Sequence, residues 1–371
     1  MIARLATVAA LLLAGGTAVA TTPPPPPLPP PLYLGADLSY VNEMEDCGAV
    51  FRKGGKPADP FALLRAAGGN IVRVRLWNDA RWTRYSGYDD VLKTIRRARA
   101  AGLQVLLDFH YSDDWADGDK QRAPIAWEKL DTDAQAAALH AFTHDTLMRL
   151  HAEGLMPEMV QVGNETNPEL MGGVKERPID WRRNAKLFAA GLRAVREVAQ
   201  ATRTDPKIML HIAQPEHVLP WFDAARDAGI TDFDVIGISY YRKWSTRTVA
   251  QLGETIAEAK RRYRKDVIVV ETAYPFTTDN GDEGPNLLGA DSLIDGYPAT
   301  PEGQKRYLID LTQQVVDAGG IGLVYWEPAW VSTGCKTRWS TGSNWENAAW
   351  FSLDTHEALP AFDFLGHDYR R

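Results

Sequence analysis

The sequence predicts an α/β protein built as a single closed (β/α)8 barrel, a TIM barrel. Eight short apolar segments rich in Val, Ile and Leu recur along the chain, a composition typical of parallel strands covered on both faces. Helical patterns fill the seven gaps between these segments. No Gly-x-Gly-x-x-Gly turn follows a strand, so the closed barrel is favoured over a doubly wound sheet.

The strand-like segments are defined by apolar runs bounded by polar or turn residues. They are Leu34–Tyr40, Asn70–Leu76, Gln104–His110, Met159–Glu165, Lys207–Ala213, Phe233–Tyr241, Val267–Tyr274 and Gly320–Glu327. Several of the loops that follow them are long and rich in aromatic, Asp and Asn residues. In a barrel of this type those loops form the functional face.

The helical segments between the strands are Pro60–Ala67, Asp90–Ala101, Asp133–Glu153, Trp181–Ala201, Trp221–Ala228, Val249–Arg264 and Pro301–Ala318. Five of these segments are followed by a glycine, the residue expected where a helix stops. These glycines are Gly68, Gly102, Gly154, Gly229 and Gly319. A final apolar segment, Leu359–Leu365, is predicted to supply the eighth helix.

The N-terminus precedes this pattern and has a different composition. Residues 1–20 combine a positive start, a short apolar run and a small-x-small ending, which predicts a signal peptide. Residues 21–32 are dominated by proline and predict a stiff linker. The (β/α)8 domain is therefore expected over residues 33–371, in a protein that is secreted or periplasmic.

The composition limits the classes of binding partner to be expected. A net charge of −7 without basic clusters argues against nucleic acid, and the sequence offers no second membrane-spanning candidate. Twelve tryptophans and thirteen tyrosines, several of them in loops after strands, favour sugar binding, because flat apolar rings suit the CH face of a pyranose. With only two cysteines, a cysteine-type zinc site is unsupported.

Two glutamates are the main catalytic candidates. Glu165 and Glu271 each close an apolar strand, where a carboxylate loses hydration. Barrel closure brings strand ends together on one face, so these distant residues are expected to be neighbours. Two such carboxyl groups can cleave a glycosidic bond, with a separation of about 5–5.5 Å in a retaining enzyme. Glu165, as the acid, is expected to have the higher pKa.

Other polar residues near strand ends are candidates for binding substrate or tuning the glutamates. Arg73, which alternation places inward, can keep a nearby carboxylate ionised. Asn164 can bind a sugar hydroxyl, and either Tyr240 or Tyr241 can donate to the nucleophile. The remaining substrate-binding candidates are Asp37, Trp77, His110 and Trp326.

Cys47 and Cys335 follow the first and the last predicted strand. Barrel closure makes those two strands neighbours, so both cysteines should lie in adjacent loops. A secreted chain also meets an oxidising compartment. The sequence therefore predicts a disulfide between them.

A set of motifs in one order resembles a known family. The motifs are Gly35–Ser39, Val72–Trp77, Asp108–Asp117, Gln161–Glu165, Ser239–Tyr241 with Trp244, Glu271–Pro275 and Tyr325–Trp330. Together they resemble the family 53 glycoside hydrolases, the arabinogalactan endo-β-1,4-galactanases. The resemblance implies retaining, endo-acting hydrolysis of β-1,4-galactan by a monomer that requires no cofactor. It assigns the proton donor to Glu165 and the nucleophile to Glu271.

Some bacterial members of that family bind calcium in the loop after the seventh strand. Here that loop offers the oxygen-bearing residues Asp279, Asp282 and Asn286, which suit a hard cation, although Gly284 stands where a ligand is expected. Two other functions remain open at this stage. One is another β-1,4-endoglycanase, such as a mannanase or a cellulase, and the other is a carbohydrate-binding barrel without catalysis.

Overall fold

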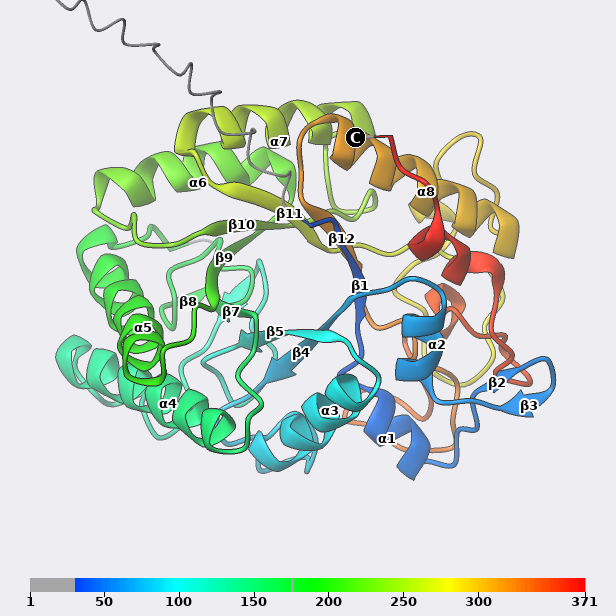
Figure 1. Cartoon of the computed structure of the whole chain (residues 1–371), viewed down its shortest axis with the longest axis horizontal. Coiled ribbons are helices and arrows are strands. Elements are labelled where there is room, and N and C mark those ends of the chain that lie inside the picture. The colour runs from blue at the N-terminus through cyan, green and yellow to red at the C-terminus, as the bar shows by residue number, and fades with distance from the viewer. Residues whose placement is uncertain (1–30, 175–176, 371) are drawn as a thin grey trace, which may run out of the picture. The chain divides into compact units, whose positions relative to one another are not determined.

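The computed structural model describes residues 31–174 and 177–370 of the chain. The predicted signal peptide and nearly all of the predicted linker lie outside these residues. Eight parallel strands close into a barrel in the order β1-β12-β11-β10-β9-β7-β5-β4. They surround the centre of the view in Figure 1, with the long helices around them. The predicted fold class is confirmed.

Each predicted segment overlaps one barrel strand, and all of these strands except β9 are shorter than predicted. They are β1 (Tyr33–Asp37), β4 (Ile71–Leu76), β5 (Gln104–Phe109), β7 (Met159–Val162), β9 (Lys207–Ala213), β10 (Val235–Ser239), β11 (Asp266–Glu271) and β12 (Gly322–Tyr325). The pairing of β1 with both β4 and β12 closes the barrel.

The helices follow the strands in the expected alternation, except that α1, an additional helix after β1, was not predicted from the sequence. They are α1 (Val41–Asp46), α2 (Pro60–Ala66), α3 (Tyr88–Ala100), α4 (Thr132–Ala152), α5 (Trp181–Thr202), α6 (Pro215–Asp227), α7 (Val249–Tyr263) and α8 (Pro301–Asp317). Side chains of Asp59, Asp131, Asp180, Thr248 and Thr300 cap five of them by accepting from first-turn amides. None of the helices in the described residues is both long enough and apolar enough to cross a membrane.

Three local features depart from the sequence-based prediction. The expected eighth helix is a 3-10 helix, η3 (Pro360–Gly366), which packs against α8. Helix α6 begins six residues before the predicted Trp221, because it accommodates Pro220 inside the helix. The loops also contain a small hairpin, β2 (Arg52–Lys53) with β3 (Lys56–Pro57), and a two-stranded antiparallel sheet that pairs β6 (Lys120–Gln121) with β8 (Gly173–Val174) from a later loop. They further contain the short 3-10 helices η1 (Ala290–Ser292) and η2 (Glu346–Ala348).

Inside the barrel the strands contribute two layers of side chains. Towards the N-terminal ends lies the apolar layer, formed by Tyr33, Ile71, Leu106, Met159, Met209, Val235, Ile268, Val270, Ile321 and Val324. Towards the C-terminal ends lies the polar layer, formed by Asp37, Arg73, Asp108, Gln161, His211, Ser239 and Glu271, all almost fully buried. The first layer fills the barrel, and the second forms the base of the site described next.

Candidate active site

Glu165 is held on a strained turn rather than on a strand. Strand β7 stops at Val162, because Gly163 adopts a φ of 85° that turns the chain away from its neighbours. Glu165 itself has a φ of 43°, a left-handed conformation that is costly for a residue with a side chain. The Gln121 amide stabilises this turn by donating to the carbonyls of Asn164 and Glu165 at 2.7 and 3.2 Å.

A β-bulge sets the direction of the Glu271 side chain. In the pairing of β10 with β11, Ile238 is opposite Val269 but Ser239 is opposite Glu271, so Val270 is an extra residue on β11. A bulge shifts the alternation of side chains along the strand that carries it. Val270 therefore joins the apolar layer inside the barrel and Glu271, the next residue, also reaches the site at its top.

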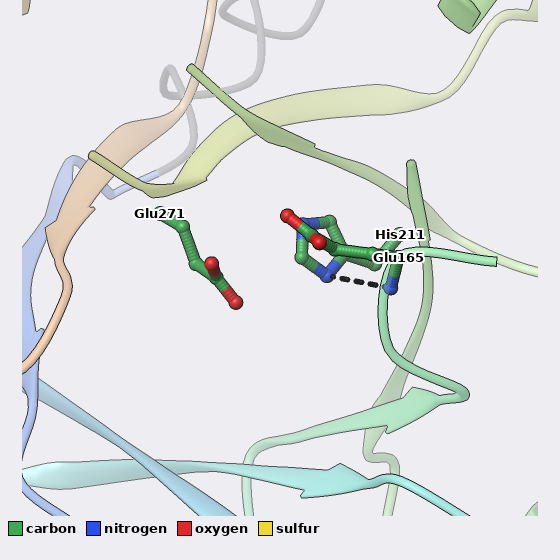
Figure 2. Close-up of side chains that lie close together, drawn as sticks. All are labelled: Glu165, His211 and Glu271. Carbon is green, nitrogen blue, oxygen red and sulfur yellow. Dashed lines mark hydrogen bonds between the residues drawn. The ribbon is translucent and has the colours of Figure 1, made fainter. Parts of the chain in front are cut away.

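The two carboxyl groups approach each other across the barrel mouth. Figure 2 shows Glu165 and Glu271 entering from opposite sides, with the His211 ring behind Glu165. One carboxylate oxygen of each glutamate and a ring nitrogen of His211 all lie within 4.8 Å of one another. Glu271 is 5% exposed and Glu165 is half-buried. The predicted proximity of the two glutamates is thus present in the structure.

Arg73 links the polar layer to Glu271. Its guanidinium is 1% exposed and contacts carboxylate oxygens of Glu271 at 2.7 Å, Asp108 at 2.8 Å and Asp37 at 3.0 Å. It also donates to the Asn164 side-chain oxygen at 2.7 Å. A buried arginine with so many acceptors is fixed in place, so it presents a permanent positive charge to Glu271.

The tyrosines after β10 have different environments. The Tyr241 hydroxyl donates to Glu271 Oε2 at 3.1 Å, as one of the two sequence-based alternatives proposed. The Tyr240 hydroxyl instead donates to the Arg247 carbonyl, and its ring is buried away from the cleft. Consecutive residues point to opposite sides of an extended chain, so only one tyrosine can reach the nucleophile candidate.

The electrostatics of the pair differ from the simple expectation. Burial raises the pKa of Glu165 to about 7 and that of Glu271 to about 8. At Glu271 the charge of Arg73 opposes this rise, whereas three nearby carboxylates add to it. The pKa is thus raised at both glutamates, and the prediction that Glu165 has the higher pKa of the two stays a prediction. Two interacting carboxyl groups titrate together, so the proton that these raised pKa values retain belongs to the pair.

The location of that proton follows from the neighbours. Glu271 contacts a permanent cation, Arg73, and the Tyr241 hydroxyl, and both favour a carboxylate. Glu165 contacts neutral groups: the Ser239 hydroxyl donates to Oε1 at 2.5 Å and the Gly118 amide to Oε2 at 3.0 Å. The arrangement therefore favours an ionised Glu271 and a protonated Glu165.

An aromatic cleft of about 550 Å³ leads to the two glutamates. Tryptophans from several loops line it: Trp115, Trp244, Trp326, Trp330, Trp339 and Trp345. Trp244 and Trp339 are about half exposed, at 46% and 45%. Flat rings at this degree of exposure suit stacking against sugar faces.

The predicted substrate-binding residues fall into two groups. Asn164, Tyr241 and Trp326 line the cleft. The others lie beneath or beside it, namely Asp37, Arg73, Trp77, His110 and Tyr240, and each is almost fully buried. The structure brings these residues close to the site, but their contacts are with other protein groups.

Trp77 and His110 support the cleft wall from below. The Trp77 ring packs edge-on against Trp115 with centroids 5.5 Å apart, and the Arg75 guanidinium lies 4.2 Å from the Trp115 ring centroid. The His110 ring contacts the Asp108 carboxylate at 3.0 Å, and burial lowers its pKa, so it is neutral near pH 7. Asp37 accepts from Ser39 as well as from Arg73.

Sequence reasoning missed several residues at the site. Ser239, Gln121 and Gly118 contact Glu165 or its backbone, and Trp115, Trp339 and Trp345 line the cleft. The abundance of tryptophan in loops was the available signal for the aromatic residues. Ser239 stands within the Ser239–Tyr241 motif, but its contact with Glu165 could not be read from the sequence, since it depends on the bulge opposite Ser239.

The predicted disulfide is confirmed. Cys47 and Cys335 are bonded with their Cα atoms 5.6 Å apart. Cys47 follows α1, in the connection after β1, and Cys335 lies in the loop after β12 that carries Trp339. The bridge therefore fixes the start of a loop that lines the cleft.

The predicted calcium loop and Glu346, which contacts it from η2, offer two kinds of oxygen. Asp282 is already used within the protein, because its oxygens accept from the Gly284 amide and from Ser332 and Ser343. Asn286 Oδ1 and Glu346 Oε2, in contrast, are buried oxygens without a hydrogen-bond partner. Unsatisfied oxygens of this kind are suitable ligands for a hard cation. The fit of the loop to calcium thus depends on Asn286 and Glu346 more than on Asp282.

A parallel barrel with two close carboxyl groups at the C-terminal strand ends, beneath an aromatic cleft, defines a glycoside hydrolase of the two-carboxylate class. The family model for glycosyl hydrolase family 53 matches residues 33–365. The chain therefore belongs to glycosyl hydrolase family 53, as the motifs had suggested.

Individual relatives agree with this membership. The chain is 51% identical over 346 residues to an arabinogalactan endo-beta-1,4-galactanase of Cellvibrio japonicus, with 92% of each chain covered. It is 36% identical to an endo-beta-1,4-galactanase of Bacillus subtilis, which covers 90% of this chain and 82% of that protein. The solved GH53 catalytic domain of Ignisphaera aggregans has a TM-score of 0.84 at 30% identity, covering 93% of this chain and 98% of that one.

Proposed function

We propose that this protein is a retaining endo-β-1,4-galactanase that hydrolyses galactan and type I arabinogalactan. Relatives with this activity in their names match most of the chain. The observation that carries the mechanism is the separation of Glu165 and Glu271, whose nearest oxygens lie within 4.8 Å. Retaining enzymes hold the two carboxyl groups about 5–5.5 Å apart, whereas inverting ones need at least about 6.5 Å for a water.

The two glutamates have separate roles in this mechanism. In the first step Glu271 attacks the anomeric carbon, the glycosidic bond breaks, and Glu165 gives its proton to the departing oxygen. In the second step water attacks the anomeric carbon, Glu165 takes a proton from that water, and Glu271 leaves. Arg73 and Tyr241 favour the charged form of Glu271 that begins and ends this cycle.

Substrate binding is assigned to the cleft that contains the glutamates. Asn164 lies next to Glu165 and lines the cleft, where it can bind the sugar hydroxyl beside the reacting carbon. Trp326 and Trp339 supply apolar faces on which successive sugars can stack. An open cleft with several such faces suits attack within a chain rather than at its end.

The test is a comparison of polysaccharides. Reducing ends released from potato-type galactan, mannan and carboxymethyl cellulose should rise only with galactan. Proton NMR of the first products should show the β-anomer before mutarotation. Release from mannan or cellulose instead would assign the chain to another β-1,4-endoglycanase, and binding of galactan without release would indicate a non-catalytic barrel. An initial α-anomer would contradict retention.

We also propose that the chain acts outside the cytoplasm, as a secreted or periplasmic monomer without nucleic-acid or membrane partners. The sequence of residues 1–20 supports export. N-terminal sequencing of the exported protein should begin at Thr21. A mature protein that starts at Met1, or a dimer by light scattering, would contradict these assignments.

Catalysis is proposed to need no cofactor, and calcium to act, where it binds, on stability. The proposed ligands are Asn286 and Glu346, with Asp279 as an exposed carboxylate in the same loop. At one hundred times its dissociation constant, calcium should stabilise the fold by about 2.7 kcal/mol. This gain, measured as a rise in Tm over EGTA, should disappear in Glu346→Gln and persist in Glu258→Gln, a control on helix α7. Equal Tm values in calcium and EGTA would contradict the site.

A further inference from the structure

Behind Glu165 lies a buried chain of hydrogen bonds that the two-glutamate mechanism does not use. The Ser239 hydroxyl is 2.5 Å from Glu165 Oε1, and His211 Nε2 is 2.8 Å from the same hydroxyl oxygen. Ser239 and His211 are both fully buried. In the view of Figure 2 the His211 ring overlaps the Glu165 side chain, and Glu271 extends toward them from the left.

The hydrogen bonds from Glu165 through Ser239 to His211 can form with Glu165 either ionised or protonated. A hydroxyl is both a donor and an acceptor, and it rotates to suit its neighbours. Burial and the charge of Arg73 hold the pKa of His211 well below its usual range, so its ring is neutral. A neutral imidazole has one donor nitrogen and one acceptor nitrogen, so Nε2 can either donate to Ser239 or accept from it.

The other ring nitrogen of His211, Nδ1, has a suitable hydrogen-bond partner whether or not it carries the proton. His211 Nδ1 lies 2.9 Å from Asn164 Oδ1, which can only accept. It lies 3.1 Å from the Gln161 amide nitrogen and 3.4 Å from the Glu165 backbone N–H, which donate. A proton on Nδ1 is therefore accepted by Asn164, and a bare Nδ1 accepts from Gln161 and Glu165. Both tautomers of the ring are satisfied.

The surroundings of Glu271 lack this property. Arg73 is a permanent cation that can only donate, whereas the Tyr241 hydroxyl, like that of Ser239, can donate or accept. Arg73 therefore favours the ionised form of Glu271. The double displacement requires one carboxyl group that stays ionised in the free enzyme and one that alternates between acid and base. The surroundings of Glu271 suit the carboxyl group that stays ionised, and those of Glu165 suit the one that alternates.

We propose that Ser239 and His211 are positioning residues that let Glu165 alternate between acid and base. When Glu165 is ionised, His211 Nε2–H donates to Ser239 and the Ser239 hydroxyl donates to Oε1. When Oε1 is protonated, it donates to Ser239, the hydroxyl donates to Nε2, and the His211 proton is on Nδ1. His211 has one proton and Ser239 one hydroxyl hydrogen in both states, so only Glu165 gains or loses charge. The assignment rests on the proposed role of Glu165.

Other titratable and charged groups also face Glu165, and any pH profile includes them. They are Asp117 from the loop after β5, Arg73 from β4, His211 from β9, Tyr241 after β10 and Glu271 from β11. His211 and Tyr241 are neutral near pH 7 and Arg73 is permanently charged. Glu271 titrates together with Glu165, so a pH profile alone does not say which carboxyl group is titrating. The tautomer of His211 reports on Glu165, because His211 is linked to Glu165 through Ser239.

The first experiment removes the Ser239 hydroxyl. Donation from Ser239 lowers the pKa of Glu165, so Ser239→Ala should move the basic limb of kcat/KM on galactan to higher pH. The loss of one neutral hydrogen bond should also reduce kcat about threefold to tenfold, with KM little changed. Ser239→Thr, which keeps a hydroxyl, should restore both. The matched control is Ser245→Ala, which removes another buried serine that donates to a glutamate, Glu216.

The second experiment observes His211 without substrate. In protein labelled with ¹⁵N-histidine, the His211 signals are those absent from His211→Gln. We expect His211 to remain neutral while its proton moves from Nδ1 at low pH to Nε2 at high pH. In Glu165→Gln this change should vanish. A single tautomer across the titration of Glu165, or a Ser239→Ala profile identical to wild type, would overturn the proposal.

The outcomes separate this proposal from the proposed function. If Glu165→Gln keeps full activity on galactan, the assignment of Glu165 as acid and base fails, whatever His211 shows. If Glu165→Gln is inactive but the tautomer of His211 is independent of pH, the enzyme assignment survives and the positioning role alone fails.

Discussion

The two layers inside the barrel are built from the same strands, yet they differ in almost every physical respect. The apolar layer consists of almost fully buried apolar and aromatic side chains, whose burial contributes stability in proportion to area. The polar layer, a few residues further along each strand, buries Arg73 among three carboxylates, an arrangement that seldom adds net stability. The comparison teaches that one layer supports the fold, and the other holds charges where a reaction needs them.

The largest expected effect is on activity in the polar layer. Glu271→Gln should reduce kcat on galactan roughly 10⁴- to 10⁶-fold, as removal of a member of a covalent catalytic set does elsewhere. The amide keeps the volume of the side chain, so the circular dichroism spectrum and Tm should stay near wild type. Turnover within tenfold of wild type would show that the layer's charge is not catalytic.

The apolar layer should respond in the opposite way. Ile268→Ala removes buried hydrocarbon and leaves a cavity, so the free energy of unfolding should fall by about 2–5 kcal/mol. Its kcat at temperatures well below the new Tm should stay within a few-fold of wild type. Ile268→Val is the graded control, with an expected loss of about 0.5–1.5 kcal/mol. A large loss of kcat in the folded variant would erase the distinction between the layers.

Removal of the disulfide tests the loops above both layers. Cys47→Ala with Cys335→Ala should lower the free energy of unfolding by about 2–5 kcal/mol, because the unfolded chain regains freedom. Since Trp339 is in the loop that Cys335 anchors, KM for galactan should rise more than kcat falls. Urea denaturation and steady-state kinetics measure the two effects. An unchanged KM would show that the disulfide does not affect substrate binding in the cleft.

The smallest expected effect is a shift of one pKa within the polar layer. The charge of Glu165 raises the pKa of Glu271, so Glu165→Gln should lower the pKa of Glu271 below about 8. In this variant Glu271 should therefore stay ionised to a lower pH than in the wild type. Carbon-13 NMR of the Glu271 carboxyl carbon measures the shift directly. In Glu258→Gln, which changes a carboxyl group on helix α7, Glu271 should titrate as in wild type.

Several features of the site could be read from the chain alone. The apolar runs, the glycines after helices and the lack of a dinucleotide-binding turn predicted the barrel. Once the barrel is assumed, strand ends converge, so Glu165 and Glu271 had to be neighbours and Cys47 and Cys335 had to lie in adjacent loops. These inferences succeed because they depend on topology, which the pattern of the sequence encodes.

What the sequence did not determine depends on registers and dihedral angles. Alternation alone would place Val270 and Glu271 on opposite sides of β11, and only the bulge opposite Ser239 brings both inward. Likewise, the choice between Tyr240 and Tyr241 and the link from His211 through Ser239 to Glu165 depend on which side chains share a face. Local sequence thus specified the strands and their order, whereas packing between strands decided which polar atoms meet, because a shift of one residue reverses the direction of a side chain.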